Sequence, residues 1–216
     1  ALYPTPGVTS FATLTQSPVR GLFEEQDRVW AAGGNRIHEI SSAGTPTSRG
    51  TVAVDGNPAT FCSSGDYGGR VFITSGDFGY SLNMSTNALA QVVTDVTMGG
   101  YVDGYFVALD AVTSTLRISG LADATTWTQT AQRTAGADRW VSLFVNHREI
   151  WLFGSKTSEV WYNAGTSPFP FLLYPGSFME QGCAAGFSVA SLDNTVVWLG
   201  RDKNGRCMVW RASGYR

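Results

Sequence analysis

Few side chains in this 216-residue sequence have types and spacings suited to catalysis. Its two histidines stand alone: His38 lies in the alternating run "RIHEI" and His147 in the turn-like stretch "VNHRE". Neither has the partner spacing of a metal site, and no nucleophile motif such as G-x-S-x-G is present. We therefore predict no catalytic residue, no metal ligand and no cofactor.

Acidic residues could supply the carboxylate pair of a glycoside hydrolase. The chain has eleven Asp and six Glu, so some pairs must come close by chance. Most of the aspartates fall in turn-like segments, where a short carboxylate bonds the local backbone: Asp27, Asp66, Asp103, Asp193 and Asp202. A glycosidase stays a weaker alternative, because it needs converging carboxylates with split pKa values.

The cysteines give no motif either. Cys62, Cys183 and Cys207 form no C-x-x-C pair, and three thiols cannot all pair within one chain. We predict reduced, buried side chains rather than a disulfide, which fits an intracellular assembly site.

Composition argues against two classes of partner. Charged residues make up 15% of the chain and the formal net charge is −2, whereas a typical protein has about 25% charged residues. This balance gives no reason to expect binding to nucleic acid or a membrane surface. No apolar run of about 18 residues is present, so we predict no membrane span. Thirteen of the fifteen basic residues are Arg, a bias typical of protein interfaces, although codon usage explains it equally well.

The elements that must position these residues are short strands in a repeat. Five windows align without gaps: "VWAAGG" from Val29, "VFITSG" from Val71, "YFVALD" from Tyr105, "EIWLFG" from Glu149 and "TVVWLG" from Thr195. Strand-like runs precede and follow each window across polar turns such as "VDG" and "DN". Three or four short antiparallel strands per ~40–45 residues are typical of β-propeller blades.

We therefore predict an all-β fold of about five four-stranded antiparallel blades, part of a larger β-propeller. The approximate blades are residues 19–54, 58–95, 96–134, 140–178 and 183–216, the last incomplete. Its missing strand could instead come from the segment "GVTSFATLT" near the N-terminus. The aromatic residues predicted in the blade cores are Trp30, Phe72, Phe106, Trp151, Trp161, Trp198 and Trp210.

One loop combines prolines with large aromatic side chains. In "NAGTSPFPFLLYPGSFMEQG", three prolines alternate with Phe169, Phe171, Tyr174 and Phe178. A rigid aromatic loop suits a preorganised contact with a partner protein. The alternative is that the loop folds back onto its own blade as the closing strand.

The stretch from Arg148 to Arg216 carries a family resemblance. The run "REIWLFGSKTSEVWYNAG", the later "PGSFMEQGCAAGFSVASLDNTVVWLGRD" and the final "GRCMVWRASGYR" resemble the packaged-DNA stabilisation proteins of short-tailed bacteriophages. These are also called tail hub or head-completion proteins. The segments "LYPTPGV", "PVRGLF", "DGYFVALD" and "LADATTWT" are similar to the family in content and order, so the resemblance covers nearly the whole chain.

The resemblance implies a structural virion protein and not an enzyme. Such proteins form a homo-oligomeric ring below the portal and its adaptor ring, plug the channel after packaging, and dock tail needle and tailspike proteins. They assemble in the cytoplasm of the host bacterium. Members of the family are longer, so the resemblance also implies that this chain is a propeller-bearing fragment. A carbohydrate-binding propeller with lectin-like or receptor-binding pockets is the alternative, ahead of a glycosidase.

Overall fold

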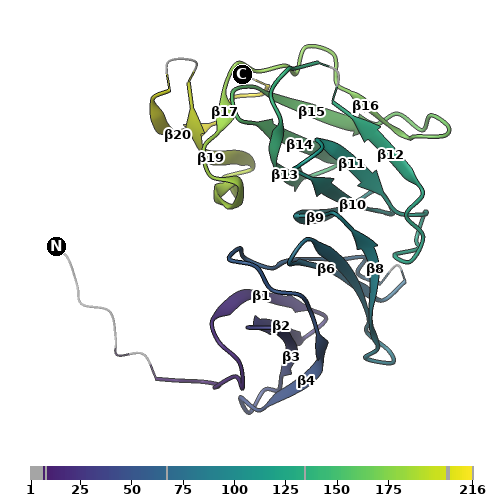
Figure 1. Ribbon diagram of the computed structural model, residues 1–216, viewed down its shortest axis with the longest axis vertical. Helices are drawn as coiled ribbons and strands as arrows, with labels where there is room; N and C mark the ends of the chain where they lie inside the picture. The colour runs from purple at the N-terminus through teal and green to yellow at the C-terminus, as the bar shows by residue number, and fades with distance from the viewer. Residues whose placement is uncertain (1–6, 8, 67, 134, 203–204, 216) are drawn as a thin grey trace.

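The chain folds into a series of β-sheets. The computed structural model describes residues 7, 9–66, 68–133, 135–202 and 205–215. In this part of the chain, twenty strands form five antiparallel sheets that follow one another along an arc (Figure 1). The prediction of an all-β fold built from propeller blades is therefore confirmed. None of the described segments forms a helix that is long and apolar enough to span a membrane.

Four of the sheets have their strands in simple up-and-down order. Blade 1 contains β1 (Val19–Glu25), β2 (Arg28–Gly33), β3 (Arg36–Ile40) and β4 (Pro46–Thr51). Blade 2 contains β5 (Thr60–Ser63), β6 (Arg70–Ser75), β7 (Phe78–Asn83) and β8 (Leu89–Thr94). Blade 3 contains β9 (Met98–Val102), β10 (Tyr105–Asp110), β11 (Thr115–Ile118) and β12 (Gln129–Gln132). Blade 4 contains β13 (Trp140–Asn146), β14 (Glu149–Gly154), β15 (Ser158–Asn163) and β16 (Phe171–Leu173).

Blade 5 has a different order. Its first strand is divided into β17 (Gly182–Cys183) and β18 (Ala190–Leu192), with the 3-10 turn Gly186–Ser188 between them. Both pieces pair with the same edge of β19 (Thr195–Arg201), and β20 (Cys207–Arg211) pairs with the other edge. Within the described residues no strand pairs with the outer edge of β20.

The N-terminal segment does not supply that strand in its described residues. Residues 9–14 form no strand. The segment lies against blade 1, where the Thr15 hydroxyl and His38 Nε2 share a hydrogen bond of 3.0 Å, and where Phe11 and Leu14 line a hollow with Leu22. The expectation that this segment closes the last blade is therefore wrong for these residues.

Hydrophobic cores fill the spaces between successive blades. One core joins blades 1 and 2, one joins blades 2 and 3, one joins blades 3 and 4, and one joins blades 4 and 5. Six of the seven aromatic residues expected in blade cores are buried: Trp30, Phe72, Phe106, Trp151, Trp161 and Trp198. The seventh, Trp210, is partly buried at the margin of the core between blades 4 and 5.

Two of the five sequence windows are out of register by one residue. The second strands of the first four blades begin at Arg28, Arg70, Tyr105 and Glu149, so the windows starting at Val29 and Val71 start one position late. A shift of one residue moves every side chain to the opposite face of the sheet. In these two strands the central residues are buried on both faces, so alternation of polar and apolar residues does not reveal the register.

Candidate functional site

The aromatic loop divides into a buried half and an exposed half. Phe171 is fully buried in β16 and Phe169 packs against the same core between blades 3 and 4. Tyr174 and Phe178, by contrast, are 38% and 42% exposed. The loop therefore returns to its own blade as the closing strand, and only its second half presents aromatic side chains to solvent.

Tyr174 is the centre of an aromatic surface on blade 4, formed by Tyr162, Tyr174 and Tyr215. The ring of Tyr174 lies 5.4 Å from that of Tyr162 and 4.9 Å from that of Tyr215, centre to centre. The Tyr215 hydroxyl donates a hydrogen bond to Glu149. Burial, reinforced by this bond and by the Glu149 charge, raises the pKa of Tyr215 to about 12. The phenol therefore stays protonated and holds the last described residue against blade 4.

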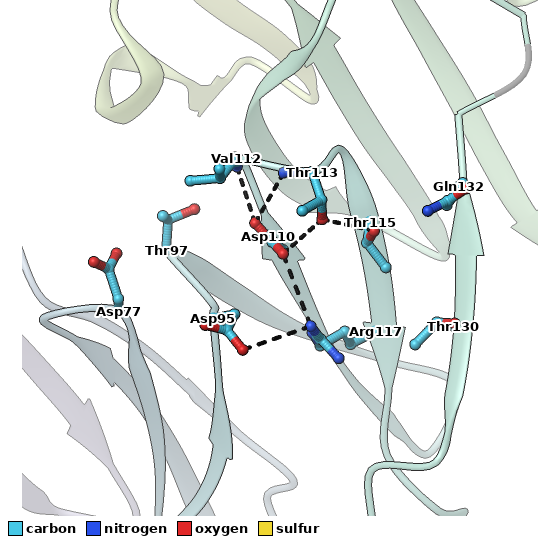
Figure 2. A pocket seen from close by; sticks show the side chains of 10 residues that line it. All are labelled: Asp77, Asp95, Thr97, Asp110, Val112, Thr113, Thr115, Arg117, Thr130 and Gln132. Atoms are coloured by element: carbon cyan, nitrogen blue, oxygen red, sulfur yellow. Dashed lines mark hydrogen bonds and ion pairs between the residues drawn. The ribbon is translucent and has the colours of Figure 1, made fainter.

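A polar cleft of about 500 Å³ lies between blades 2 and 3 (Figure 2). Its lining residues are Asp77, Asp95, Thr97, Asp110, Val112, Thr113, Thr115, Arg117, Thr130 and Gln132. Asp110 and Arg117 lie on the same face of blade 3 as Ala108, which packs in the core between blades 2 and 3. The cleft therefore lies where the interface between blades 2 and 3 opens to solvent.

Within the cleft, hydrogen bonds hold Asp110 in place. Its carboxylate accepts bonds from the backbone N–H of Val112 at 2.9 Å and of Thr113 at 3.1 Å, and from the Thr113 hydroxyl at 2.6 Å. Arg117 Nη2 lies 3.8 Å from Asp110 and 3.9 Å from Asp95, so one guanidinium forms ion pairs with both carboxylates (Figure 2). Of these two carboxylates Asp110 is buried and Asp95 is 68% exposed, so only Asp95 presents its charge to solvent.

A pair of carboxyl groups with split pKa values occurs between blades 3 and 4. Burial raises the pKa of Glu159. Burial acts in the same direction on Asp138, but hydrogen bonds from Thr157 and from the Lys156 N–H, with the charge of Arg133, lower its pKa overall. Arg133 lies 3.1 Å from Asp138 and 3.6 Å from Glu159, and the Glu159 side chain is buried. The group has the arrangement of a structural ion cluster, because solvent does not reach Glu159.

The histidines do not converge. His38 is buried in blade 1, where burial lowers its pKa. His147 is in the exposed turn before β14, where its Nε2 lies 2.7 Å from Asn194 Oδ1. No group of three or more His, Cys, Asp or Glu residues that could hold a metal ion is found in the described residues.

Sequence reasoning missed the polar cleft and the Arg133 cluster. One signal was present: among the five windows only "YFVALD" ends in a residue other than Gly, and that residue is Asp110. The Arg133 cluster gave no local signal, since Arg133 and Glu159 meet only when blades 3 and 4 pack together.

Comparisons with known proteins identify the family and the fold. The family model described as "Bacteriophage P22 Gp10, beta-propeller" matches residues 1–216. No curated protein sequence matches the chain.

Similar solved structures include PorZ, a surface component of the type-IX secretion system of Porphyromonas gingivalis. PorZ has a TM-score of 0.55 and 14% identity, over 93% of this chain and 28% of PorZ. Virginiamycin B lyase from Staphylococcus aureus has a TM-score of 0.59 and 12% identity, over 84% of this chain and 62% of the lyase. U3-55K has a TM-score of 0.60 and 13% identity, over 95% of this chain and 64% of U3-55K. The chain thus spans less than two thirds of each of them, and at such identities the likeness shows the fold alone.

Proposed function

The chain belongs to the phage packaged-DNA stabilisation family, whose model is the β-propeller of P22 Gp10, and from this premise we propose that it plugs the portal channel at the head-to-tail junction. As a member of this family it is a structural component of the virion. In the proposed role it assembles in the host cytoplasm as a ring below the portal and adaptor. The match over the whole chain is the observation that carries the proposal.

The packing of the blades supports a role in which the protein must resist mechanical force. Each sheet is hydrogen-bonded within itself, and a separate apolar core joins it to the next sheet. Pulling one blade away exposes the core on each of its packed faces, at about 25 cal/mol per Å² of apolar surface. Such an assembly suits a plug held against packaged DNA.

Charge supports a steric mode of retention. The formal net charge is −2, and only fifteen of 216 residues are Lys or Arg. Several of these arginines are already engaged, as Arg20, Arg28 and Arg133 pair with acidic residues of the same chain. Because phosphate binding requires free cationic side chains, we propose that the protein blocks the channel and does not grip the DNA.

For docking of the tail needle or tailspike, we propose the aromatic surface on blade 4, extended by Phe178. Partly exposed tyrosines on a rigid sheet lose little conformational entropy when a partner binds, and aromatic residues are enriched at interfaces. Tyr174 is held between Tyr162 and Tyr215 and is still 38% exposed, so it supports this assignment best.

The test is a DNA-retention assay on phage particles that lack the gene. We expect such particles to package DNA and then lose it, and added full-length protein to restore retention. Full-length protein carrying Tyr174→Ala and Phe178→Ala is the matched variant: it should restore retention but bind the tail needle more weakly. If particles without the protein keep their DNA and fail only at adsorption to the host, the plug proposal is wrong.

A carbohydrate-binding role is the second candidate, and one observation favours it. The aromatic surface lies beside Glu149, which accepts the hydrogen bond from Tyr215. Rings next to a carboxylate could contact both the apolar face and the hydroxyls of a sugar. Binding of host surface glycans to the purified chain, lost in Tyr174→Ala, would support this candidate over docking of a tail protein.

A further inference from the structure

The four interfaces between neighbouring blades are built from the same positions of the second strands. The third and fifth residues of a second strand face the following blade, as Trp151 and Phe153 of β14 face blade 5. The second and fourth residues face the preceding blade, as Val196 and Trp198 of β19 face blade 4. The same positions fill the other cores: Trp30 and Ala32 with Val71 and Ile73, Phe72 with Phe106 and Ala108, and Val107 and Leu109 with Ile150 and Leu152. Each interface therefore joins the following side of one blade to the preceding side of the next.

Blade 5 exposes its following side. The third and fifth residues of β19 are Val197 and Leu199, and Leu199 is paired with Val209 of β20. Leu199 is 38% exposed and Val209 is 77% exposed, whereas Phe153, the equivalent of Leu199 in blade 4, is fully buried. Leu192 of β18 extends the same surface and is 52% exposed. In the described part of the chain this surface, the outward face of blade 5, is open to solvent.

Blade 1 exposes part of its preceding side, at the opposite end of the arc from blade 5 (Figure 1). The second and fourth residues of β2, Val29 and Ala31, line a hollow of about 360 Å³. Leu22 of β1 also lines this hollow and is 67% exposed. Apart from Ser10, all the lining residues are apolar. This hollow and the strand residues beside it form the outward face of blade 1.

Charge also differs between the two ends of the molecule. Blade 5, from residue 182 onward, has five basic and two acidic residues, whereas the rest of the chain has ten basic and fifteen acidic residues. Arg201 and Arg211 are exposed on the outward face of blade 5, and the pair that Arg211 forms with Asp193 at 3.8 Å is itself exposed. Glu24 is exposed on the outward face of blade 1. The two faces are therefore complementary in charge.

We propose that the outward face of blade 5 packs on the outward face of blade 1 of a second copy of this chain. Leu199 and Val209 enter the apolar hollow, and Arg201 and Arg211 approach the acidic blade of the neighbour. The contact continues the arrangement inside the chain, because a following side again meets a preceding side. The inference rests on the proposed ring for its role in the virion, and it names the subunit contact of that ring.

The proposed contact is heterologous, because two different surfaces meet. A dimer formed in this way keeps one outward face of each kind free, so further copies add until a ring closes or a filament grows. The alternative is a two-fold contact between two copies of blade 5. Charge disfavours it, since it brings together the two blades that carry the excess of basic residues.

The test is sedimentation velocity of the 216-residue chain over a series of micromolar concentrations. We expect species larger than a dimer to form as the concentration rises, and fewer of them at high salt. Val209→Asp alters blade 5 and Leu22→Asp alters blade 1. Each variant alone should associate at least roughly tenfold more weakly than the wild type, because it brings an unpaired carboxylate into an apolar contact.

Mixing the two variants separates a head-to-tail contact from any other. Val209→Asp keeps its blade 1 face and Leu22→Asp keeps its blade 5 face, so the mixture should form a 1:1 dimer that does not grow further. Leu121→Asp, at a 64% exposed position of blade 3, is the control and should associate as the wild type does. Thermal unfolding checks that all three variants keep the fold, which is expected because Val209, Leu22 and Leu121 are exposed.

Three results would overturn the proposal: a wild-type chain that stays monomeric, a single variant that associates as the wild type does, or a mixture of the two variants that stays monomeric. A monomeric chain would mean that a different protein segment covers the outward face of blade 5. None of these results bears on DNA retention, which the particle assay measures separately, so failure of the contact is distinguishable from failure of the plug.

Discussion

At the scale of single residues, Glu39 is the centre of an ion cluster on blade 1. Arg28 Nε donates to it at 2.8 Å and Arg49 Nε at 2.7 Å. Arg28 also lies over the ring of Trp30 and donates to the Met84 carbonyl of blade 2. Hydrogen bonds from Arg28, opposed in part by burial and supported by Arg49, lower the pKa of Glu39. The cluster thus ties blade 1 to blade 2 through the Arg28 guanidinium, which Glu39 holds in place.

Glu39→Gln is expected to lower the free energy of unfolding at neutral pH by about 1–3 kcal/mol, because the three charge-assisted hydrogen bonds from Arg28 and Arg49 are weakened. A lowered folded pKa gives stability that is present above the unfolded value of 4.5 and is lost as pH falls through the folded pKa. The difference between wild type and variant should therefore shrink as pH falls below 4.5. Urea unfolding across this range measures it. Glu180→Gln, at an exposed position, is the control and should show no such change.

The cysteines differ in reactivity for a physical reason. All three are free thiols, with Cys183 buried, Cys62 partly buried and Cys207 exposed. Burial raises the pKa of both Cys62 and Cys183, and the thiolate is the reactive form. We expect one fast-reacting thiol per chain in a titration with Ellman's reagent at mildly alkaline pH, and its loss in Cys207→Ser. A fast phase that survives in this variant would contradict the assignment.

At the scale of elements, the proline-rich loop has one half buried in blade 4 and one half partly exposed to solvent. Its first half ends in β16, which pairs with β15 and closes blade 4. Its second half returns along the same blade, where Ser177 bonds both the N–H and the carbonyl of Val160. Fixed at both ends, the loop holds Tyr174 and Phe178 in partly exposed positions.

Phe171→Ala and Phe178→Ala are a matched pair of variants, because the same truncation is made at a buried and at an exposed position of the loop. Phe171 is fully buried, so its truncation should lower the free energy of unfolding by about 3–5 kcal/mol. Phe178 is 42% exposed, and its truncation should cost less than about 1 kcal/mol. Denaturant unfolding of both variants measures the difference. Equal losses would mean that the loop does not return to blade 4 as described.

At the scale of the whole molecule, the five blades form a row with two unlike ends. The N-terminal segment lies on the free face of blade 1. On blade 5, Leu192, Leu199 and Val209 lie on the face turned away from blade 4 and are exposed. Exposed apolar patches of this kind mark surfaces that meet other protein. The charge of the molecule, in contrast, is small and of the wrong sign for contact with DNA.

We therefore expect no salt-dependent binding of the chain to duplex DNA. A protein that neutralises several phosphates loses orders of magnitude in affinity between roughly 50 mM and 200 mM salt. Fluorescence anisotropy with a labelled duplex should show no binding at the lower salt concentration. Tight binding that weakens steeply with salt would mean that retention is electrostatic and not steric.

Much of the fold could be predicted from local patterns, whereas little of the candidate site could. Hairpins depend on neighbouring residues: Asp27, Asp103 and Asp193 adopt positive φ at the turns where the sequence places them. The aromatic loop was located by its composition, but Phe171 and Phe178 are the same residue type, and nothing local separates the buried one from the exposed one.

The sequence by itself determined the five strand repeats and the turns between them, because backbone propensity and turn chemistry act over a few residues. The tertiary structure alone decided the register of β2 and β6, since both faces of these strands are buried and the period of two disappears. It also decided which arginine meets which carboxylate. Arg20 meets Asp55 and Arg133 meets Glu159 only because neighbouring blades pack together.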